Sequence, residues 1–79
     1  MEREIKELIA RHYKRAQIIG VAVDIDRIVL NVRGVKMEWV AKRLLDKYPQ
    51  IYWVFTAGGW VYSRETLKWL GYKIKKDEL

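Results

Sequence analysis

The chain has 79 residues, a formal net charge of +6 and a sequence pI of about 9.7, with no cysteine and one histidine, His12. This composition excludes disulfides, thiolate metal centres and histidine clusters, and the length predicts one small domain over residues 1–79 with a modest core. Lys, Arg and Glu are abundant, while Asn and Gln are scarce. That bias is typical of thermophilic proteins and of designed scaffolds without an evolved activity, so we expect a thermostable chain.

The sequence predicts no contact with a membrane. Met1 is followed directly by charged residues, which is not the pattern of a secretory signal peptide. No apolar run reaches the roughly 18 residues of a membrane span. Residues 76–79, Lys-Asp-Glu-Leu, spell an endoplasmic-reticulum retrieval signal, which acts only in secreted proteins, and we interpret them as a charged tail. We therefore expect a cytoplasmic protein.

The first half of the chain predicts a helix, a β-hairpin and a second helix. Residues 1–16 show an amphipathic helical pattern, and residues 18–25 and 28–33 alternate as two strands. Residues 36–48 are again helical in pattern, and Pro49 ends that helix. The side chains expected in the core are Ile5, Leu8, Ile9, Tyr13 and Ala16, then Ile19, Val21, Val23 and Ile25, then Ile28, Leu30 and Val32, then Met37, Val40, Ala41, Leu44 and Tyr48.

Residues 51–56 are β-branched or aromatic and predict a third strand. Because side chains alternate along a strand, one face is expected in the core, made of Ile51, Trp53 and Phe55. Gly58 and Gly59 follow this strand, and paired glycines favour a tight turn.

The last part of the chain predicts a short helix over residues 64–70 and a final strand. Ser63 is a good N-cap, and Gly71 stands where a left-handed residue ends a helix. Residues 72–75 alternate apolar and basic side chains, a pattern typical of an edge strand. The predicted order is therefore α-β-β-α-β-α-β, an α+β two-layer sandwich with two long helices on one face of a three- or four-stranded sheet.

One acidic pair is a candidate metal site. Asp24 and Asp26 would face the same side of an extended chain and could hold Mg²⁺. With the apolar residues around them they resemble the first motif of haloacid-dehalogenase-like phosphatases, and Thr56 stands where that family has its second motif. However, Arg27 replaces the family's glycine and the second acidic pair is missing. We interpret the aspartates as turn residues, and we expect no catalytic residue, no bound metal, no cofactor and no enzymatic activity.

The remaining signal is basic charge combined with an uncovered sheet face. On the side away from the helices the expected outward residues are Asn31, Arg33, Tyr52, Lys73 and Lys75, beside the small Gly20 and Ala22. Aromatic and basic side chains on an open sheet are what single-stranded nucleic acid binds. We therefore predict DNA or RNA binding through Arg33, Tyr52, Lys73 and Lys75.

Three alternatives stay open. Trp39, Trp60 and Trp69 lie off the predicted core stripes, which favours a homodimeric protein-interaction module. Residues 62–71 resemble the start of a DNA-recognition helix, so a winged helix with the hairpin as its wing is a second route to DNA. The predicted helix, hairpin, helix and strand up to Phe55 also resemble the topology of BON-type modules, which bind partners or membrane surfaces.

Overall fold

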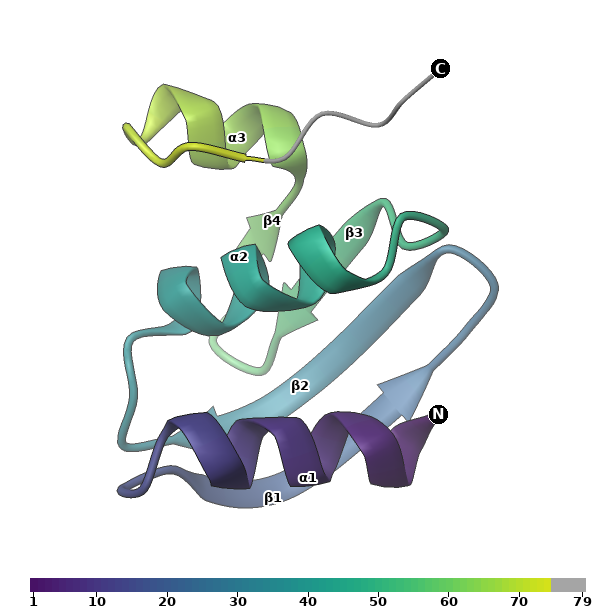
Figure 1. Cartoon of the computed structure of the whole chain (residues 1–79), viewed down its shortest axis with the longest axis vertical. Helices are drawn as coiled ribbons and strands as arrows, with labels where there is room; N and C mark the ends of the chain where they lie inside the picture. The colour runs from purple at the N-terminus through teal and green to yellow at the C-terminus, as the bar shows by residue number, and fades with distance from the viewer. Residues whose placement is uncertain (75–79) are drawn as a thin grey trace.

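The computed structural model describes residues 1–74, which form a four-stranded sheet with three helices (Figure 1). The elements are α1 (Glu2–His12), β1 (Gln17–Val23), β2 (Arg27–Arg33), α2 (Met37–Lys47), β3 (Trp53–Thr56), β4 (Val61–Tyr62) and α3 (Arg64–Trp69). The strand order is β1-β2-β3-β4, with β2 and β3 parallel and the two outer pairs antiparallel. The predicted α+β class, with two long helices, is confirmed.

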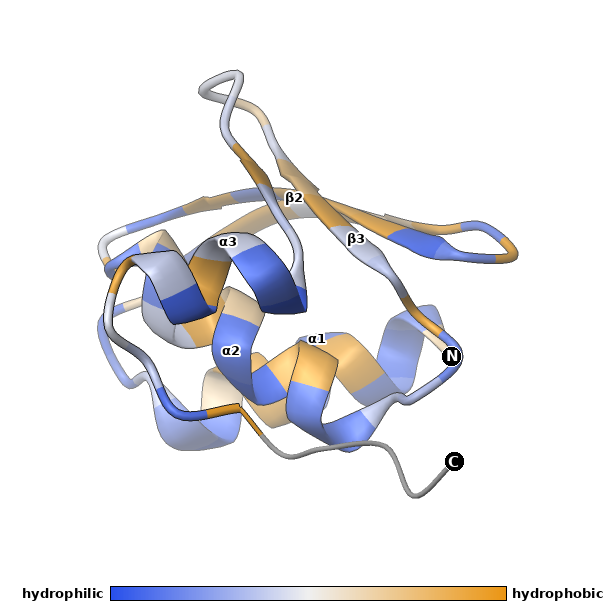
Figure 2. Ribbon diagram, turned by 90° about the horizontal axis from the view of Figure 1, so that it is seen from above, coloured by the Kyte–Doolittle hydropathy of each residue, from blue (hydrophilic) through white to orange (hydrophobic). Residues whose placement is uncertain are grey.

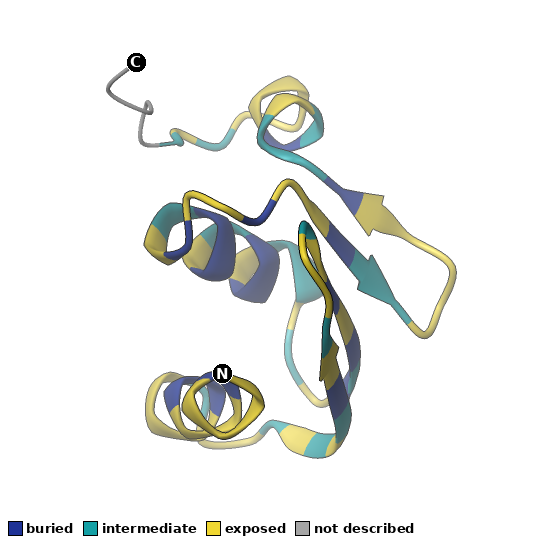
Figure 3. Ribbon diagram, turned by 90° about the vertical axis from the view of Figure 1, so that its right-hand side faces the viewer, coloured by how far each residue is buried: buried dark blue, intermediate teal, exposed yellow. Residues whose placement is uncertain are grey.

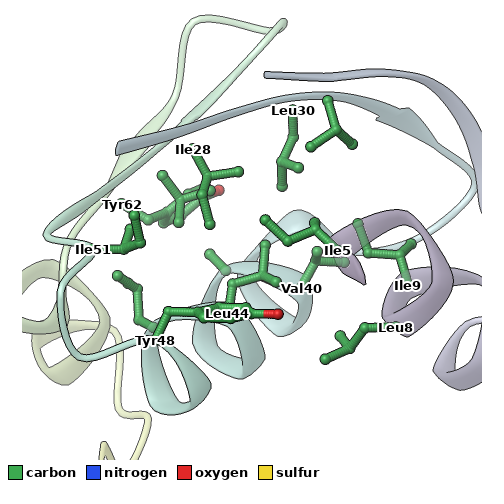
Figure 4. Packing of buried hydrophobic residues seen from close by; sticks show 14 of the residues in the cluster. Ile5, Leu8, Ile9, Ile28, Leu30, Val40, Leu44, Tyr48, Ile51 and Tyr62 are labelled. Carbon is green, nitrogen blue, oxygen red and sulfur yellow. The ribbon is translucent and has the colours of Figure 1, made fainter. Parts of the chain in front are cut away.

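The two long helices lie side by side on one face of the sheet (Figures 1 and 3). Helix α2 is the crossover that the parallel pair β2 and β3 needs, and α1 runs antiparallel to it. Figure 4 shows the core between the helices and the inner face of the sheet. Its buried side chains include Ile5, Leu8 and Ile9 from α1, Val40, Ala41, Leu44 and Leu45 from α2, and Val21, Ile28, Leu30, Val32, Val54 and Tyr62 from the strands.

Helix α1 is shorter than its periodicity predicts, because it ends at His12 rather than at residue 16. Tyr13 leaves the helical conformation with φ of −130°, and the Ala16 amide donates to the Tyr13 carbonyl in a turn. Tyr13 and Ala16 still pack against the core, as predicted. The apolar spacing therefore indicates which side chains are buried but not where the helix ends.

Strand β1 departs from the predicted alternation at a bulge. Ile18 pairs with Val32, but Gly20 pairs with Asn31, so Ile19 is an extra residue without a partner in β2. Its side chain is 58% exposed, although the alternation predicts it in the core. Ile25, also predicted in the core, lies in the turn after β1 and is 89% exposed. A single inserted residue moves the side chains that precede it to the other face.

Strand β3 presents the face opposite to the one predicted. Ile51 is buried as expected, but Trp53 is 40% exposed, and the core residue of the strand is Val54. The amides of Tyr52 and Trp53 both donate to the Asp26 carbonyl, at 2.7 and 3.1 Å, so the regular strand begins only at Trp53. This break in the alternation leaves Trp53 and Phe55 on the side away from the helices.

The end of the chain also differs from the predicted order. After the turn at Gly59, which has φ of +89°, residues Val61–Tyr62 form β4 beside β3. By contrast, the expected edge strand over residues 72–75 is wrong for the part that the structure describes, since residues 72–74 form no strand; Lys75 lies outside the described residues.

The alternation of residues 72–75 has another cause. Tyr72 and Ile74 pack against the core, and the Tyr72 hydroxyl donates to Glu38 Oε1 of α2 at 2.7 Å. Any extended segment with one side buried shows the same period, whether or not it joins a sheet.

Both predicted caps of the short helix α3 are confirmed, although the helix ends at Trp69, one residue before the predicted end. The Ser63 hydroxyl accepts from the Thr66 amide, and the Thr66 hydroxyl accepts from the Ser63 amide, which forms a capping box. At the other end, Gly71 has φ of +98° and the Tyr72 amide donates to the Leu67 carbonyl. This Schellman arrangement directs the chain back toward α2.

Tyr48 links the end of α2 to α1. Because of this contact, we expect the protein to lose stability in alkali. Its hydroxyl donates to Glu4 Oε1 at 2.9 Å, and burial, then this hydrogen bond, then the Glu4 charge raise the pKa of Tyr48 to about 12. An unfolded tyrosine has a pKa of about 10, so the protonated phenol favours the fold. This contribution is complete below about pH 10 and is lost as the pH rises toward 12.

Urea unfolding of wild type and Tyr48→Phe from pH 9 to 12 measures this loss. The variant is expected to lose less stability over that interval, because its ring has no proton to release. Burial also raises the pKa of Tyr62, but both proteins share that residue and its effect cancels. Equal alkaline slopes in the two proteins would contradict the prediction.

Candidate functional site

The surface, rather than the interior, holds the side chains that can bind a ligand. Within residues 1–74 no polar or charged residue is fully buried, and every buried side-chain nitrogen or oxygen has a hydrogen-bond partner. The interior of the described chain is therefore a satisfied apolar core. Two surfaces of the described chain present such side chains: the sheet face away from the helices, and the groove between α1 and α2.

The sheet face away from the helices, called here the open sheet face, is covered by no helix of the described chain (Figures 2 and 3). Strand pairing and burial place its outward side chains in register across four strands. They are Gln17, Gly20 and Ala22 on β1, Arg27, Val29, Asn31 and Arg33 on β2, Trp53 and Phe55 on β3, and Val61 on β4.

The centre of the open sheet face is aromatic. Trp53 pairs with Arg27 and Phe55 with Val29 along the parallel strands. The Arg27 guanidinium carbon lies 5.2 Å from the centroid of the Phe55 ring, a cation–π distance. Arg27 also forms an ion pair with Asp26 at the rim, at 3.1 Å, and side-chain exposures of about 40% on both partners make that pair weak. Its guanidinium is therefore held over a ring at the surface.

Of the four residues predicted to bind nucleic acid, the structure brings two to this region. Arg33 is exposed at the end of β2 on the open sheet face. Tyr52 is 57% exposed and lies just before β3, beside the turn at Asp26. Lys73 belongs to the segment after α3 and to no strand, and Lys75 lies outside the described residues. The sequence pattern did not identify Trp53 and Phe55, because it assigned their face to the core.

The acidic pair lies in the turn between β1 and β2. Asp24 Oδ1 accepts from the Ile25 amide at 2.7 Å, which is a local turn contact, and Asp26 pairs with Arg27. The register places Arg27 beside Trp53 and Leu30 beside Thr56, so Thr56 lies at the opposite end of β3 from the two aspartates. The structure does not bring together the residues that resemble the two phosphatase motifs.

Over residues 1–74 no three His, Asp or Glu side chains are grouped closely enough to hold a metal ion. No helix in that range has the length and apolar character needed to cross a membrane.

The three tryptophans predicted outside the core are all exposed, but they lie on different parts of the surface. Trp39 on α2 is 51% exposed, Trp60 in the turn before β4 is 69% exposed, and Trp69 on α3 is 81% exposed. Trp39 lines the groove between the long helices, whereas Trp60 lines a smaller depression beside the ends of β2 and β3. The three rings therefore form no common patch.

Helix α3 does not follow another helix through a short turn. Two strands, β3 and β4, separate it from α2. A helix-turn-helix requires a connection of three or four residues, so these two helices do not form that motif.

No protein-family model, curated protein or solved structure matches this chain.

Proposed function

We propose that the protein binds single-stranded nucleic acid on the open sheet face. The observation that carries this proposal is the pair of aromatic side chains, Trp53 and Phe55, on the outer face of the central strand β3. Residues two apart on a strand are separated by about 6.6 Å, so the Trp53 ring and the Phe55 ring, the latter with the Arg27 guanidinium over it, are spaced to contact successive bases of an extended strand. Four-stranded sheets that recognise RNA stack bases on central-strand aromatics in this way.

The charge of the open sheet face supports the same ligand. Arg27 and Arg33 are exposed at the two ends of β2, and in the described sheet no outward strand position carries Asp or Glu. Guanidinium groups on either side of the rings provide contacts to phosphates, and the one carboxylate beside them is that of Asp26, which pairs with Arg27 in the adjoining turn. Phosphate contacts release counterions, so affinity is expected to fall as salt concentration rises.

Fluorescence anisotropy with labelled single-stranded and duplex oligonucleotides, at about 50 and 200 mM salt, tests the proposal. We expect tighter binding of the single strand and weaker binding at the higher salt. Trp53→Ala is expected to weaken binding by about tenfold, because one base–aromatic stack contributes about 1–3 kcal/mol.

Trp69→Ala is the matched control, since it removes the same side chain from an exposed position on α3. It should leave the affinity unchanged. Absence of binding at the lower salt and micromolar protein refutes the proposal, and equal losses in the two tryptophan variants refute its location on the sheet.

A second candidate function is a homodimer that buries the same face. The observation in its favour is the apolar content of outward positions, with Val29 at 42% and Val61 at 39% exposure on either side of Phe55, and Trp53 on the same face. Exposed apolar patches of this kind mark interfaces in small proteins. Sedimentation velocity at about 100 μM distinguishes the candidates: a dimer that Trp53→Ala converts to monomer favours the interface, and a monomeric wild type excludes it.

A further inference from the structure

The groove between α1 and α2 lies on the opposite side of the molecule from the open sheet face. It has a volume of about 740 Å³ and is lined by Leu8, Arg11, His12, Tyr13, Trp39, Lys42, Arg43, Asp46 and Lys47. Pockets of about 300–1,000 Å³ accommodate small molecules. Leu8 is buried and forms an apolar part of the groove, while the long polar side chains come from both helices.

Helical periodicity explains why cations line the groove from both sides. On α2, Trp39, Arg43 and Lys47 recur every four residues and therefore share one stripe of the helix. On α1, Arg11 lies three residues after Leu8 and so shares its face. The lining contains four permanent cations and one carboxylate, Asp46, which accepts from Lys42 Nζ at 2.7 Å.

Hydrogen bonds hold the two walls of the groove in place. At one end the Tyr13 hydroxyl donates to the Trp39 carbonyl at 3.1 Å, and Arg43 Nε donates to the same hydroxyl at 3.0 Å. At the other end of the helix pair, the Tyr48 hydroxyl donates to Glu4. The helices are therefore fixed to each other on both sides of the groove, and the Arg43 guanidinium is positioned before any ligand arrives.

His12 lines the groove, where its surroundings disfavour the charged imidazolium. Desolvation, then the charges of Arg43, Arg11 and Lys14, lower the pKa of His12 below its ordinary value. Lys42, Lys47 and Asp46 also line the groove that His12 faces. Because cations already disfavour the imidazolium, an anion bound among them has the opposite effect and favours it.

We propose that the groove between α1 and α2 binds a small phosphorylated compound, with its phosphate groups between Arg11 on one helix and Arg43 and Lys47 on the other. Phosphate oxygens match these donors in charge and in hydrogen-bonding geometry. Trp39 lines the same groove and is half exposed, so its ring is available to stack on a nucleobase. This site goes beyond nucleic-acid binding on the open sheet face and does not depend on it.

Proton NMR of the single imidazole tests the proposal, because His12 is the only histidine in the sequence. Pyrophosphate, adenosine diphosphate and adenosine are titrated separately into the protein at about pH 6.5, near the ordinary histidine pKa. Both phosphate compounds are expected to move the His12 ring resonances with saturation and to raise its pKa. Adenosine, which has no phosphate, is expected to leave them in place.

The variant Arg11→Gln/Lys47→Gln removes one cation from each wall and leaves Arg43 bonded to Tyr13. It is expected to weaken pyrophosphate binding by about tenfold or more, since it removes two charge-assisted contacts to the phosphate groups. Arg3→Gln/Lys6→Gln is the matched control, because it lowers the net charge equally at exposed positions of α1 outside the groove lining. The control should bind as wild type does.

The outcomes distinguish recognition of the phosphate groups alone from recognition of a whole nucleotide. Equal affinities for pyrophosphate and adenosine diphosphate support recognition of the phosphate groups alone. Tighter binding of the nucleotide, reduced to the pyrophosphate level by Trp39→Leu, supports recognition of the base as well. The proposal is overturned if neither compound moves the His12 resonances at about 10 mM, far above the millimolar affinities of weak ligands, or if the groove variant binds as tightly as its control.

Discussion

Gly34→Ala is expected to lower the free energy of unfolding by about 3–4 kcal/mol, because an alanine at this position combines backbone strain with a steric clash. Gly34 has φ of +83°, a conformation that costs an L-residue with a Cβ about 1–2 kcal/mol. A Cβ at this position would also lie 2.5 Å from the Arg15 carbonyl oxygen and 3.8 Å from the Ala16 Cα. Both neighbours are backbone atoms, so relief requires the loop after α1 to move away from the loop after β2.

Two other glycines separate strain from collision in urea unfolding followed by tryptophan fluorescence. Gly59 has φ of +89°, but a Cβ added there would meet no atom within 4 Å, so Gly59→Ala is expected to show only the conformational cost, about 1 kcal/mol. Gly20 has neither problem, and Gly20→Ala is expected to be neutral or slightly stabilising. Equal destabilisation by the Gly34 and Gly59 substitutions would show that the Arg15 backbone moves away from the added Cβ without loss of stability.

Arg64→Met is expected to destabilise the protein by about 3 kcal/mol, because Arg64 satisfies three backbone carbonyls at once. Its Nη2 donates to the carbonyls of Leu45 at 2.6 Å and Tyr48 at 3.1 Å, and Nη1 donates to that of Ile51 at 2.8 Å. The Leu45 and Tyr48 carbonyls lie at the end of α2, where a helix has no partners of its own and where its dipole favours a cation.

Arg64→Lys keeps the charge but not the planar fork, so an intermediate loss of stability is expected from it. Lys68→Met provides the control on the same helix, since Lys68 is exposed, and it should change stability by less than about 0.5 kcal/mol. Chemical denaturation of the four proteins measures these differences. If Arg64→Met were as stable as Lys68→Met, the hydrogen bonds of Arg64 to the three carbonyls would not contribute to stability.

The parts of the fold that the sequence predicted are those set by local chemistry. The hairpin of β1 and β2, helix α2 and both caps of α3 follow from periodicity, from Pro49 and from Ser63 with Gly71. In each case a short stretch of chain determines its own structure, because a cap or a repeating apolar stripe needs no distant partner.

The predictions that were wrong depend on distant hydrogen bonds. The first residue of β3 is set by the Asp26 carbonyl, which accepts from both Tyr52 and Trp53, and no pattern within residues 51–56 reports that contact. A one-residue offset was enough to exchange the faces of the strand. The candidate site differs from the predicted one for the same reason, because Trp53 and Phe55 were expected in the core but lie on the open sheet face.

The strand β4 and the contacts of Arg64 were missed for a related reason. Val61–Tyr62 is too short for alternation to be recognised, and it is a strand only through its pairing with β3. The sequence around Arg64 indicates only an exposed helical residue. Its three acceptors lie 13 to 19 positions earlier in the chain, so no local pattern indicates these contacts.

The bulge at Ile18 and Gly20 has a consequence for how the molecule behaves at high concentration. Strand β1 is at one edge of the sheet, and the other edge is β4, which has only two residues. An uninterrupted row of free amides and carbonyls on an edge strand recruits further chains into fibrils. The extra residue interrupts that row near the start of β1 and leaves only residues 20–23 in regular register before the turn. Deleting Ile19 is therefore expected to restore a continuous edge and to increase the pairing of β1 with other chains at high concentration.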